Sequence, residues 1–235
     1  MPKVKVIIPA FNEQDSIAKV IQDIPSLVEE IIVVSNNSTD LTEINAKNAG
    51  ATVLTENNKG YGYACLKGMD YIASTSLSDP SKKPDIIVFL DGDYSDYPEE
   101  LTKIIAPIIE DNIDLVIGSR DKELREDGAM TPQQIFGNWL ATKLMLIFFN
   151  AKFTDLGPFR AIKYEKLLAL NMVDKTYGWT VEMQLKALKQ KLSYTEVPVN
   201  YRNRIGVSKV SGTIKGSIFA GIKILSWIFK YSFKQ

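Results

Sequence analysis

The chain of 235 residues contains no histidine and only one cysteine, Cys65. Without histidine, neither a serine–histidine–aspartate triad nor a histidine-ligated zinc site can be built. A lone cysteine cannot form an internal disulfide bond, which is the usual situation in a reducing compartment. Any acid–base chemistry must therefore come from carboxylates, lysines or tyrosines.

Acidic residues are missing from one end of the chain, although the whole chain is balanced. The formal net charge is zero, from 28 basic and 28 acidic residues. After Glu196 no acidic residue occurs, whereas seven lysines and arginines do. A neutral chain with a cationic end argues against general nucleic-acid binding and favours a local anionic partner.

Long apolar runs are also missing. No uninterrupted apolar stretch reaches the ~18 residues expected of a membrane-spanning helix. The chain begins with a predicted strand rather than with a signal peptide. Its length and its apolar content of 45% fit one large α/β domain. We expect residues 1–211 to form this single domain and residues 212–235 to form a separate C-terminal helix.

Short apolar runs alternate with helical patterns, which predicts βαβ units around a Rossmann-like, mostly parallel open sheet flanked by helices. The predicted strands are 4–9, 30–34, 51–54, 86–91, 114–118 and 194–201. The predicted helices are 15–24, 42–49, 63–73, 133–149 and 182–189, with a polar loop at 74–84.

Residues 212–235 form a basic amphipathic pattern. At about 100° per residue, Lys215, Lys223, Lys230 and Lys234 fall within about a third of the helix circumference, and most other positions are aliphatic or aromatic. This pattern is typical of a helix that lies in the interface of an anionic membrane. The alternative is a terminal helix whose apolar face packs on the core while its lysines are solvated.

Two aspartates follow the most apolar predicted strand. The run Ile-Ile-Val-Phe-Leu-Asp-Gly-Asp ends at Asp91 and Asp93, and the carboxyl ends of parallel strands are where open α/β sheets bind ligands. Two carboxylates on a tight turn suit Mg²⁺ or Mn²⁺ and, through the metal, a diphosphate. The alternative is a helix N-terminus, where acidic side chains are favoured.

Three further loops should meet these aspartates at the same edge of the sheet. In the first, Pro9 ends a strand, and Phe11 with Glu13 would contact a nucleoside by stacking and hydrogen bonds. Glu13 would alternatively serve in a capping box of the next helix. The second loop, 35–40, consists of short polar residues. The third, 57–62, is glycine-rich and opens a helix, a shape that favours anions.

Several motifs occur in a recognisable order along nearly the whole chain. They are the run from Val6 to Glu13, the turn from Asn36 to Asp40, Lys59-Gly60 before a helix, and Asp91-Gly92-Asp93. In this order they resemble family 2 glycosyltransferases of the GT-A fold. Segments 155–160, 177–182 and 202–209 are similar to the branch that contains dolichyl-phosphate mannose synthases and their bacterial relatives.

The resemblance implies an inverting hexosyltransferase that uses a UDP- or GDP-linked sugar. It implies that Asp93, with Asp91, holds Mg²⁺ or Mn²⁺. The implied nucleotide-binding residues are Pro9, Phe11, Glu13, Ser35, Lys59 and Asp91. The implied phosphate-binding residues are Arg120, Arg202, Ser208 and Lys209, for which the alternative is a solvated basic surface. Ser35 stands where the family usually has an acidic residue that reads the base, so the base is left open.

The acceptor decides whether a catalytic base is required. A lipid phosphate is already anionic and needs none. For a sugar or lipid hydroxyl, Asp155 is the first candidate base and Glu182 the second, although Asp155 would equally cap the turn that follows it. The expected partners are a nucleotide-sugar donor, a lipid-phosphate or glycan acceptor and an anionic membrane surface. The expected location is peripheral, at the cytoplasmic face of the membrane.

Two other classes of function stay open from the sequence. A haloacid-dehalogenase-like phosphatase also places Asp-x-Asp after an apolar strand, but normally after the first strand, whereas Asp91 follows several βα units. The other class is a non-catalytic membrane-bound module that keeps the nucleotide-binding fold, with which Ser35 is compatible.

Overall fold

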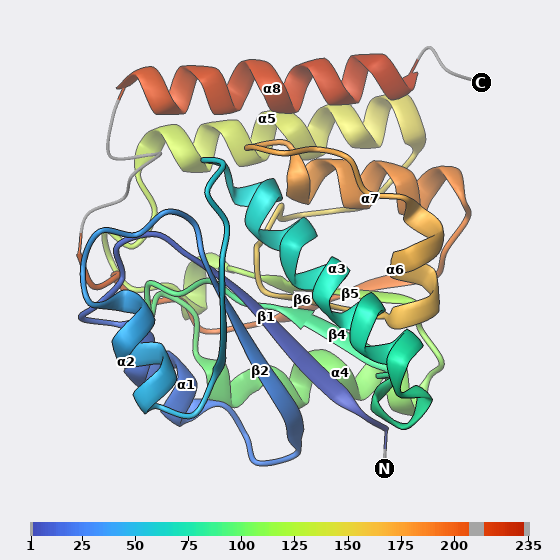
Figure 1. Ribbon diagram of the computed structural model, residues 1–235. Coiled ribbons are helices and arrows are strands. Elements are labelled where there is room, and N and C mark those ends of the chain that lie inside the picture. Colours follow the sequence, from blue (N-terminus) through green and yellow to red (C-terminus); the bar gives the residue numbers. More distant parts are fainter. Residues whose placement is uncertain (1, 207–213, 233–235) are drawn as a thin grey trace.

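The computed structural model describes residues 2–206 and 214–232, with only the backbone described for 214–218. A seven-stranded sheet forms its centre, in the order β3-β2-β1-β4-β6-β5-β7 (Figure 1). Neighbouring strands pair in parallel except β6, which is antiparallel to both β4 and β5. The strands are β1 (Val4–Ala10), β2 (Val28–Ser35), β3 (Thr52–Thr55), β4 (Ile86–Phe89), β5 (Leu115–Ser119), β6 (Arg160–Lys163) and β7 (Tyr194–Pro198).

Helices cover both faces of the sheet (Figure 1). One buried cluster packs α3, α5, α6, α7 and α8 against the sheet, and the other packs α1, α2 and α4. The predicted open, mostly parallel sheet flanked by helices is therefore confirmed. The helices are α1 (Ile17–Asp23), α2 (Thr42–Asn48), α3 (Tyr61–Ser78), α4 (Leu101–Glu110), α5 (Pro132–Phe149), α6 (Tyr164–Leu170), α7 (Trp179–Lys189) and α8 (Ile214–Ser232).

The central strand β1 shows why this sheet forms. All its residues are buried, as expected of a parallel strand covered on both faces. Ile7 belongs to one cluster, whereas Val6 and Ile8 belong to the other, because successive side chains of a strand point to opposite faces. The buried Lys5 ammonium is compensated by the Glu30 carboxylate at 2.8 Å.

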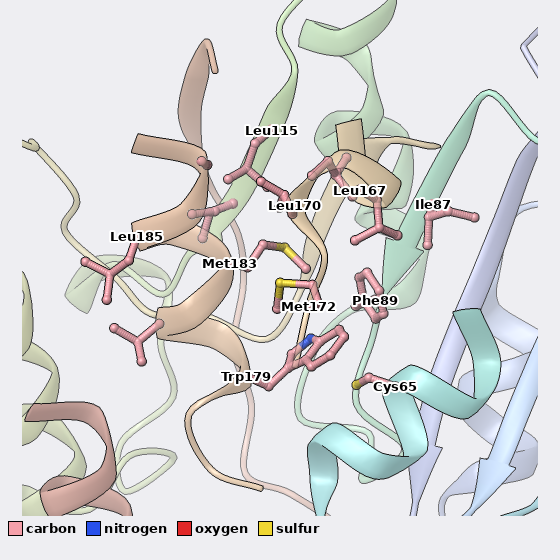
Figure 2. Packing of buried hydrophobic residues seen from close by; sticks show 14 of the residues in the cluster. Cys65, Ile87, Phe89, Leu115, Leu167, Leu170, Met172, Trp179, Met183 and Leu185 are labelled. Atoms are coloured by element: carbon pink, nitrogen blue, oxygen red, sulfur yellow. The ribbon is translucent and has the colours of Figure 1, made fainter. Parts of the chain in front are cut away.

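The end of β4 is fixed by aromatic packing. Phe89 on β4 and Trp179 at the start of α7 meet edge to face, with ring centroids 5.7 Å apart (Figure 2). Cys65 of α3 lies in the same buried cluster, and burial raises the pKa of its thiol well above the usual value. This packing holds the strand that leads directly to Asp91.

The structure differs from the predicted elements in several places. The polar loop predicted for 74–84 was wrong in its first part, because α3 continues to Ser78. The hydroxyls of Ser74, Thr75 and Ser78 donate to backbone carbonyls within the helix, so these polar residues are accommodated there. The last predicted strand is shorter, since β7 ends at Pro198. The short strand β6 was missed because it begins with the charged Arg160 and has no apolar run.

Candidate active site

A cavity of about 550 Å³ lies at the edge of the sheet where β1, β2, β3 and β4 end. All four loops expected at this edge contribute to its wall, and the opposite wall comes from α5 and α8. The residues from the four loops include Pro9, Phe11, Glu13, Asn36, Lys59, Asp91 and Asp93. The cavity therefore gathers five of the six residues implied for nucleotide binding, and Ser35 is the exception.

Asp91 lines this cavity with a carboxylate that has one unpartnered oxygen. Its Oδ1 atom is buried and has no hydrogen-bond partner among the described residues. Burial raises the pKa of Asp91 to about 7, and the charge of Asp93 adds to the rise. A buried polar atom without a partner on a cavity wall is typical of a site that binds a ligand or an ion.

Asp93 is held from two sides. Its Oδ1 accepts hydrogen bonds from the Ser95 backbone N–H at 3.0 Å and from the Ser95 hydroxyl at 2.6 Å. Its Oδ2 lies 3.0 Å from one terminal nitrogen of Arg204, and the other terminal nitrogen lies 2.9 Å from Oε1 of Glu13. The Arg204 guanidinium thus links acids from two different loops at the mouth of the cavity.

Asp96 adds a further acidic group behind the pair. Both of its carboxyl oxygens are buried and lack a hydrogen-bond partner among the described residues. Burial raises the pKa of Asp96 well above its usual value, and the charges of Asp91 and Asp93 raise it further. The neutral form of this side chain is therefore favoured in the fold.

Sequence reasoning selected Arg202 and missed Arg204. Arg202 lies outside the cavity lining; its Nε donates to the Tyr94 carbonyl at 2.7 Å, and its guanidinium carbon lies 3.4 Å from the centroid of the Tyr94 ring. Its phosphate role stays a prediction, as do those of Ser208 and Lys209, which lie outside the described residues. The signal in the sequence was the basic segment that contains both arginines, and it does not distinguish one from the other.

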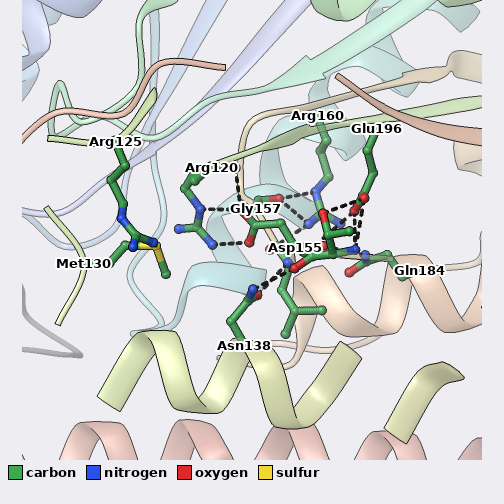
Figure 3. Close-up of polar contacts among 11 residues, drawn as sticks. Arg120, Arg125, Met130, Asn138, Asp155, Gly157, Arg160, Gln184 and Glu196 are labelled. Atoms are coloured by element: carbon green, nitrogen blue, oxygen red, sulfur yellow. Dashed lines mark hydrogen bonds and ion pairs between the residues drawn. The ribbon is translucent and has the colours of Figure 1, made fainter. Parts of the chain in front are cut away.

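Arg120 lines the cavity, but its guanidinium is bound to Asp155 (Figure 3). Nε donates to Oδ2 at 2.8 Å and a terminal nitrogen donates to Oδ1 at 2.5 Å. Burial alone would raise the pKa of the Asp155 carboxyl, but the charge and hydrogen bonds of Arg120 hold it below its usual value. This two-pronged pair fixes the end of β5 against the segment that precedes β6.

The second candidate base, Glu182, lies fully buried in α7. Its carboxylate accepts hydrogen bonds from the backbone N–H groups of Val173 at 3.0 Å and Asp174 at 2.7 Å, and Lys186 lies 2.8 Å away. Neither Glu182 nor Asp155 is part of the lining of the 550 Å³ cavity. Their predicted role as a base is not tested by these contacts, which instead stabilise two loops.

Asp174 connects the same loop to the C-terminal helix. Its Oδ1 accepts from the backbone N–H of Thr176 at 2.7 Å, and its Oδ2 accepts from Nε1 of Trp227 at 2.6 Å and pairs with Lys223 at 3.1 Å. The neighbouring carbonyl of Lys175 accepts from the backbone N–H of Tyr63, at the start of α3. The loop therefore joins α8 to the region that follows Lys59.

Asn36, rather than Ser35, lines the cavity and holds the loop around Gly60. Its Oδ1 accepts from the backbone N–H of Gly60 at 2.7 Å, and its Nδ2 donates to the Asn58 carbonyl at 2.6 Å. Ser35 is fully buried, and its hydroxyl has no partner among the described residues. Gly60 has a φ of +148°, and a Cβ there would collide with the carbonyl of Lys175. Only glycine permits this close approach.

The donor set at the cavity fits a hard divalent cation shared with a ligand. Asp91 and Asp93 supply carboxylate oxygens, which Mg²⁺ and Mn²⁺ prefer. Within 2–206 and 214–232, no group of three or more His, Cys, Asp or Glu side chains is arranged to hold a metal by itself. The two carboxylates, of which Asp91 has an unpartnered oxygen, therefore suit an ion whose remaining ligands would be phosphate oxygens and water.

Comparison with solved structures identifies the fold. The glucosyl-3-phosphoglycerate synthase of Mycobacterium tuberculosis, crystallised with Mn²⁺, UDP and glucosyl-3-phosphoglycerate, superposes with a TM-score of 0.75 at 22% identity. The match covers 98% of this chain and 80% of that one. The protein thus has the GT-A fold.

The sequence comparisons identify the family. The family model described as glycosyl transferase family 2 matches residues 5–168. An uncharacterised glycosyltransferase of Mycobacterium tuberculosis is 33% identical over 92% of this chain and 94% of its own. The low-salt glycan biosynthesis hexosyltransferase Agl6 of Haloferax volcanii is 29% identical over 87% of this chain and 49% of its own. The chain belongs to glycosyltransferase family 2 and is an enzyme of that family.

Proposed function

We propose that the protein moves a hexose from a UDP- or GDP-linked donor to a lipid phosphate or glycan acceptor, with inversion at the transferred carbon. The observation that carries the proposal is the meeting of Asp91 and Asp93 with Glu13 and Arg204 on one cavity wall. The two aspartates would bind a cation, and the positive charge of Arg204 would balance the diphosphate. The loop with Phe11 would contact the nucleoside. Family membership supports a transferase over a phosphatase.

Each wall of the cavity has a task in this proposal. Asp91 and Asp93 would hold Mg²⁺ or Mn²⁺, which acts as a Lewis acid toward the departing diphosphate. Structural neighbours crystallised with Mn²⁺ or Mg²⁺ and UDP support a divalent ion. Lys59 and Arg204, both on the cavity wall, bring positive charge to the phosphates. Phe11 and Glu13 are placed for the nucleoside.

The contacts of the candidate bases favour an acceptor that is already ionised. Asp155 is committed to Arg120, and Glu182 is committed to backbone N–H groups and Lys186. Neither lines the larger cavity. A lipid phosphate carries its own negative charge at neutral pH and needs no proton removed before attack. A lipid-phosphate acceptor agrees with the resemblance to the dolichyl-phosphate mannose synthase branch.

A lipid acceptor implies that the enzyme works as a peripheral protein at the cytoplasmic face of a membrane. The far wall of the cavity supports such an acceptor, since Met130, Tyr177 and Ile224 bring apolar surface to it. In the part of the chain that the structure describes, no helix combines the length and the apolar character needed to cross a bilayer.

Titration calorimetry with UDP and GDP, with and without Mn²⁺, tests the proposal. We expect one nucleotide to bind at least ten-fold more tightly with Mn²⁺, and Asp93→Asn to abolish this gain. Asp111→Asn, at an exposed position on another part of the surface, is the matched control. Failure of both nucleotides to bind with Mn²⁺ would reject the proposal. Nucleotide binding without sugar transfer or donor hydrolysis would identify a non-catalytic module. Hydrolysis of an aryl phosphate that is lost in Asp91→Asn would identify a phosphatase.

A further inference from the structure

Helices α5 and α8 lie side by side along the top of the protein and run in the same direction (Figure 1). Both present large apolar side chains to solvent: Ile147 is 71% exposed, Phe219 62% and Phe136 61%. The rings of Phe148 on α5 and Phe229 on α8 pack edge to face, with centroids 5.7 Å apart, so apolar side chains of the two helices are in contact. A soluble surface helix would normally carry polar residues at these positions.

Apart from Phe148, the exposed apolar residues of α5 fall on one stripe, which also contains Lys143. Phe136, Trp139, Lys143 and Ile147 follow one another at intervals of three or four residues, and all are exposed. The buried residues Ala141 and Met145 belong to the core cluster. The core contacts of α5 therefore leave this stripe uncovered, and it needs an explanation outside the fold.

A second cavity, of about 460 Å³, adjoins the same side of α5. Trp139 and Leu146 bring apolar surface to it, and Arg125, Lys143 and Lys152 bring positive charge. Arg120 and Asp155 also line it, but their charges compensate each other. The remaining acidic group on the wall is Asp121, so basic groups exceed acidic ones. An apolar rim around basic groups complements an anionic lipid headgroup.

We propose that α5 and α8 together form a face that docks on an anionic lipid bilayer. The lipid-docking face is defined by Phe136, Trp139, Ile147, Phe219, Ile222 and Phe229, with Lys143 and Lys152 at the adjoining cavity. Neither helix contains an aspartate or glutamate. Two copies of this face would bring lysines toward lysines, whereas an anionic bilayer complements both the apolar and the basic groups.

The lipid-docking face adds a membrane surface to the proposed function. It rests on that proposed function only for the identity of the acceptor. Gln133, Gly137 and Asn138 of α5 line the larger cavity, and Phe136 and Trp139 are exposed on the same helix. One helix, about 10 Å across, therefore separates the cavity from the docked bilayer. The proposed lipid acceptor would thus come from a bilayer that lies next to the cavity.

Intrinsic fluorescence gives a direct test, because only one tryptophan faces solvent. Of the three tryptophans, Trp179 and Trp227 are buried, whereas Trp139 is 52% exposed. With the intact protein, we expect a blue shift on addition of phosphatidylcholine vesicles that also contain phosphatidylglycerol. Pure phosphatidylcholine vesicles should give a much smaller shift, and Trp139→Phe should remove the shift.

Sedimentation with the same vesicles measures the contribution of each group. Phe136→Ser and Ile147→Ser should each weaken binding about ten-fold, as expected from the loss of a buried apolar side chain. Lys143→Gln and Lys152→Gln should each weaken it about five-fold, since a basic residue near an anionic surface contributes about 1 kcal/mol. Ile44→Ser and Lys47→Gln, exposed on α2, are the matched controls and should bind like the parent protein.

Three outcomes would overturn the docking face. They are equal binding to both kinds of vesicle, no loss of binding in the α5 variants, and a dimer that these variants dissociate without any vesicle binding. The last result would assign the face to a second copy of the chain. Nucleotide binding with Mn²⁺, measured on the same samples, reports on the proposed function separately, and the α5 variants should leave it unchanged.

Discussion

The guanidinium of Arg204 lies 3.0 Å from Oδ2 of Asp93. The carboxylate implied for the metal therefore already has a positive partner within the chain. In the proposed function, a divalent ion that binds Asp93 would compete with Arg204, and a displaced Arg204 would find its next anion in the diphosphate. This exchange would couple the binding of the ion to the binding of the donor.

Arg204→Ala should therefore have opposite effects on two ligands. Mn²⁺ alone should bind several-fold more tightly, because its competitor is removed, whereas UDP or GDP with Mn²⁺ should bind more weakly. Electron paramagnetic resonance of free Mn²⁺ and calorimetry of the nucleotide measure the two effects. Arg204→Lys keeps the charge and should lie between the parent and the alanine variant. Weaker binding of Mn²⁺ alone in Arg204→Ala would contradict the exchange.

Asp91→Asn should stabilise the metal-free protein at high pH. The pKa of Asp91 is raised to about 7 in the fold, against about 4 in an unfolded chain. An acid with a raised pKa destabilises the fold increasingly as pH rises from about 4 to about 7, and fully above that. The gain in melting temperature should thus be largest at pH 8 and absent near pH 4.

A gain of about 1 kcal/mol would raise the melting temperature by about 2–4 °C in a protein of this size. Differential scanning calorimetry in the presence of a chelator measures it. Asp111→Asn, at an exposed position, should show no such pH dependence. Equal stability of Asp91→Asn and the parent protein at pH 8 would contradict the claim that the charged Asp91 carboxylate destabilises the fold.

The Arg120–Asp155 pair should be stabilising as a unit and costly to break. Asp155→Ala leaves a buried guanidinium without its partner, for which we expect a loss of about 3–5 kcal/mol in urea unfolding. The pKa of Asp155 is lowered in the fold, so its contribution is present above about pH 4 and lost as pH falls through the folded value. Replacing both residues by Met and Leu should cost less than the single change. A fully stable Asp155→Ala would contradict this account.

Two glycines should respond to alanine with opposite signs. Gly137 lies inside α5, and a Cβ there has no atom within 4 Å, so Gly137→Ala should stabilise by about 0.5–1 kcal/mol. At Gly60 a Cβ would collide with the Lys175 carbonyl. Gly60→Ala should therefore destabilise the protein and weaken nucleotide binding. Thermal unfolding and calorimetry with UDP or GDP measure both, and equal behaviour of the two variants would contradict the placement of the Gly60 loop.

The sequence was sufficient for elements that local chemistry determines. The apolar run before Asp91 predicted a buried strand, and Gly50, with a φ of +96°, ends α2 as a left-handed residue should. The helix 133–149 matches α5, which begins with a capping box between Thr131 and Gln134. Each of these signals lies within a few neighbouring residues.

The rest depends on contacts between distant segments. Nothing in the sequence near Asp155 reveals that this candidate base is bound by Arg120, 35 residues earlier. Arg202 and Arg204 are equivalent in the sequence, and only the fold brings one to the Tyr94 ring and the other to Asp93. For the same reason the sequence did not show that Ser35 is buried by the register of β2, whereas Asn36 lines the cavity.

The Asp174 carboxylate and its loop join the last helix to the start of α3. It binds Trp227 and Lys223 of the last helix, and the loop that it orders receives the first amides of α3 beside Lys59. If the last helix docks on a bilayer as proposed, a displacement of that helix would act on the loop proposed to bind the donor. Membrane docking and donor binding would then depend on the same contacts.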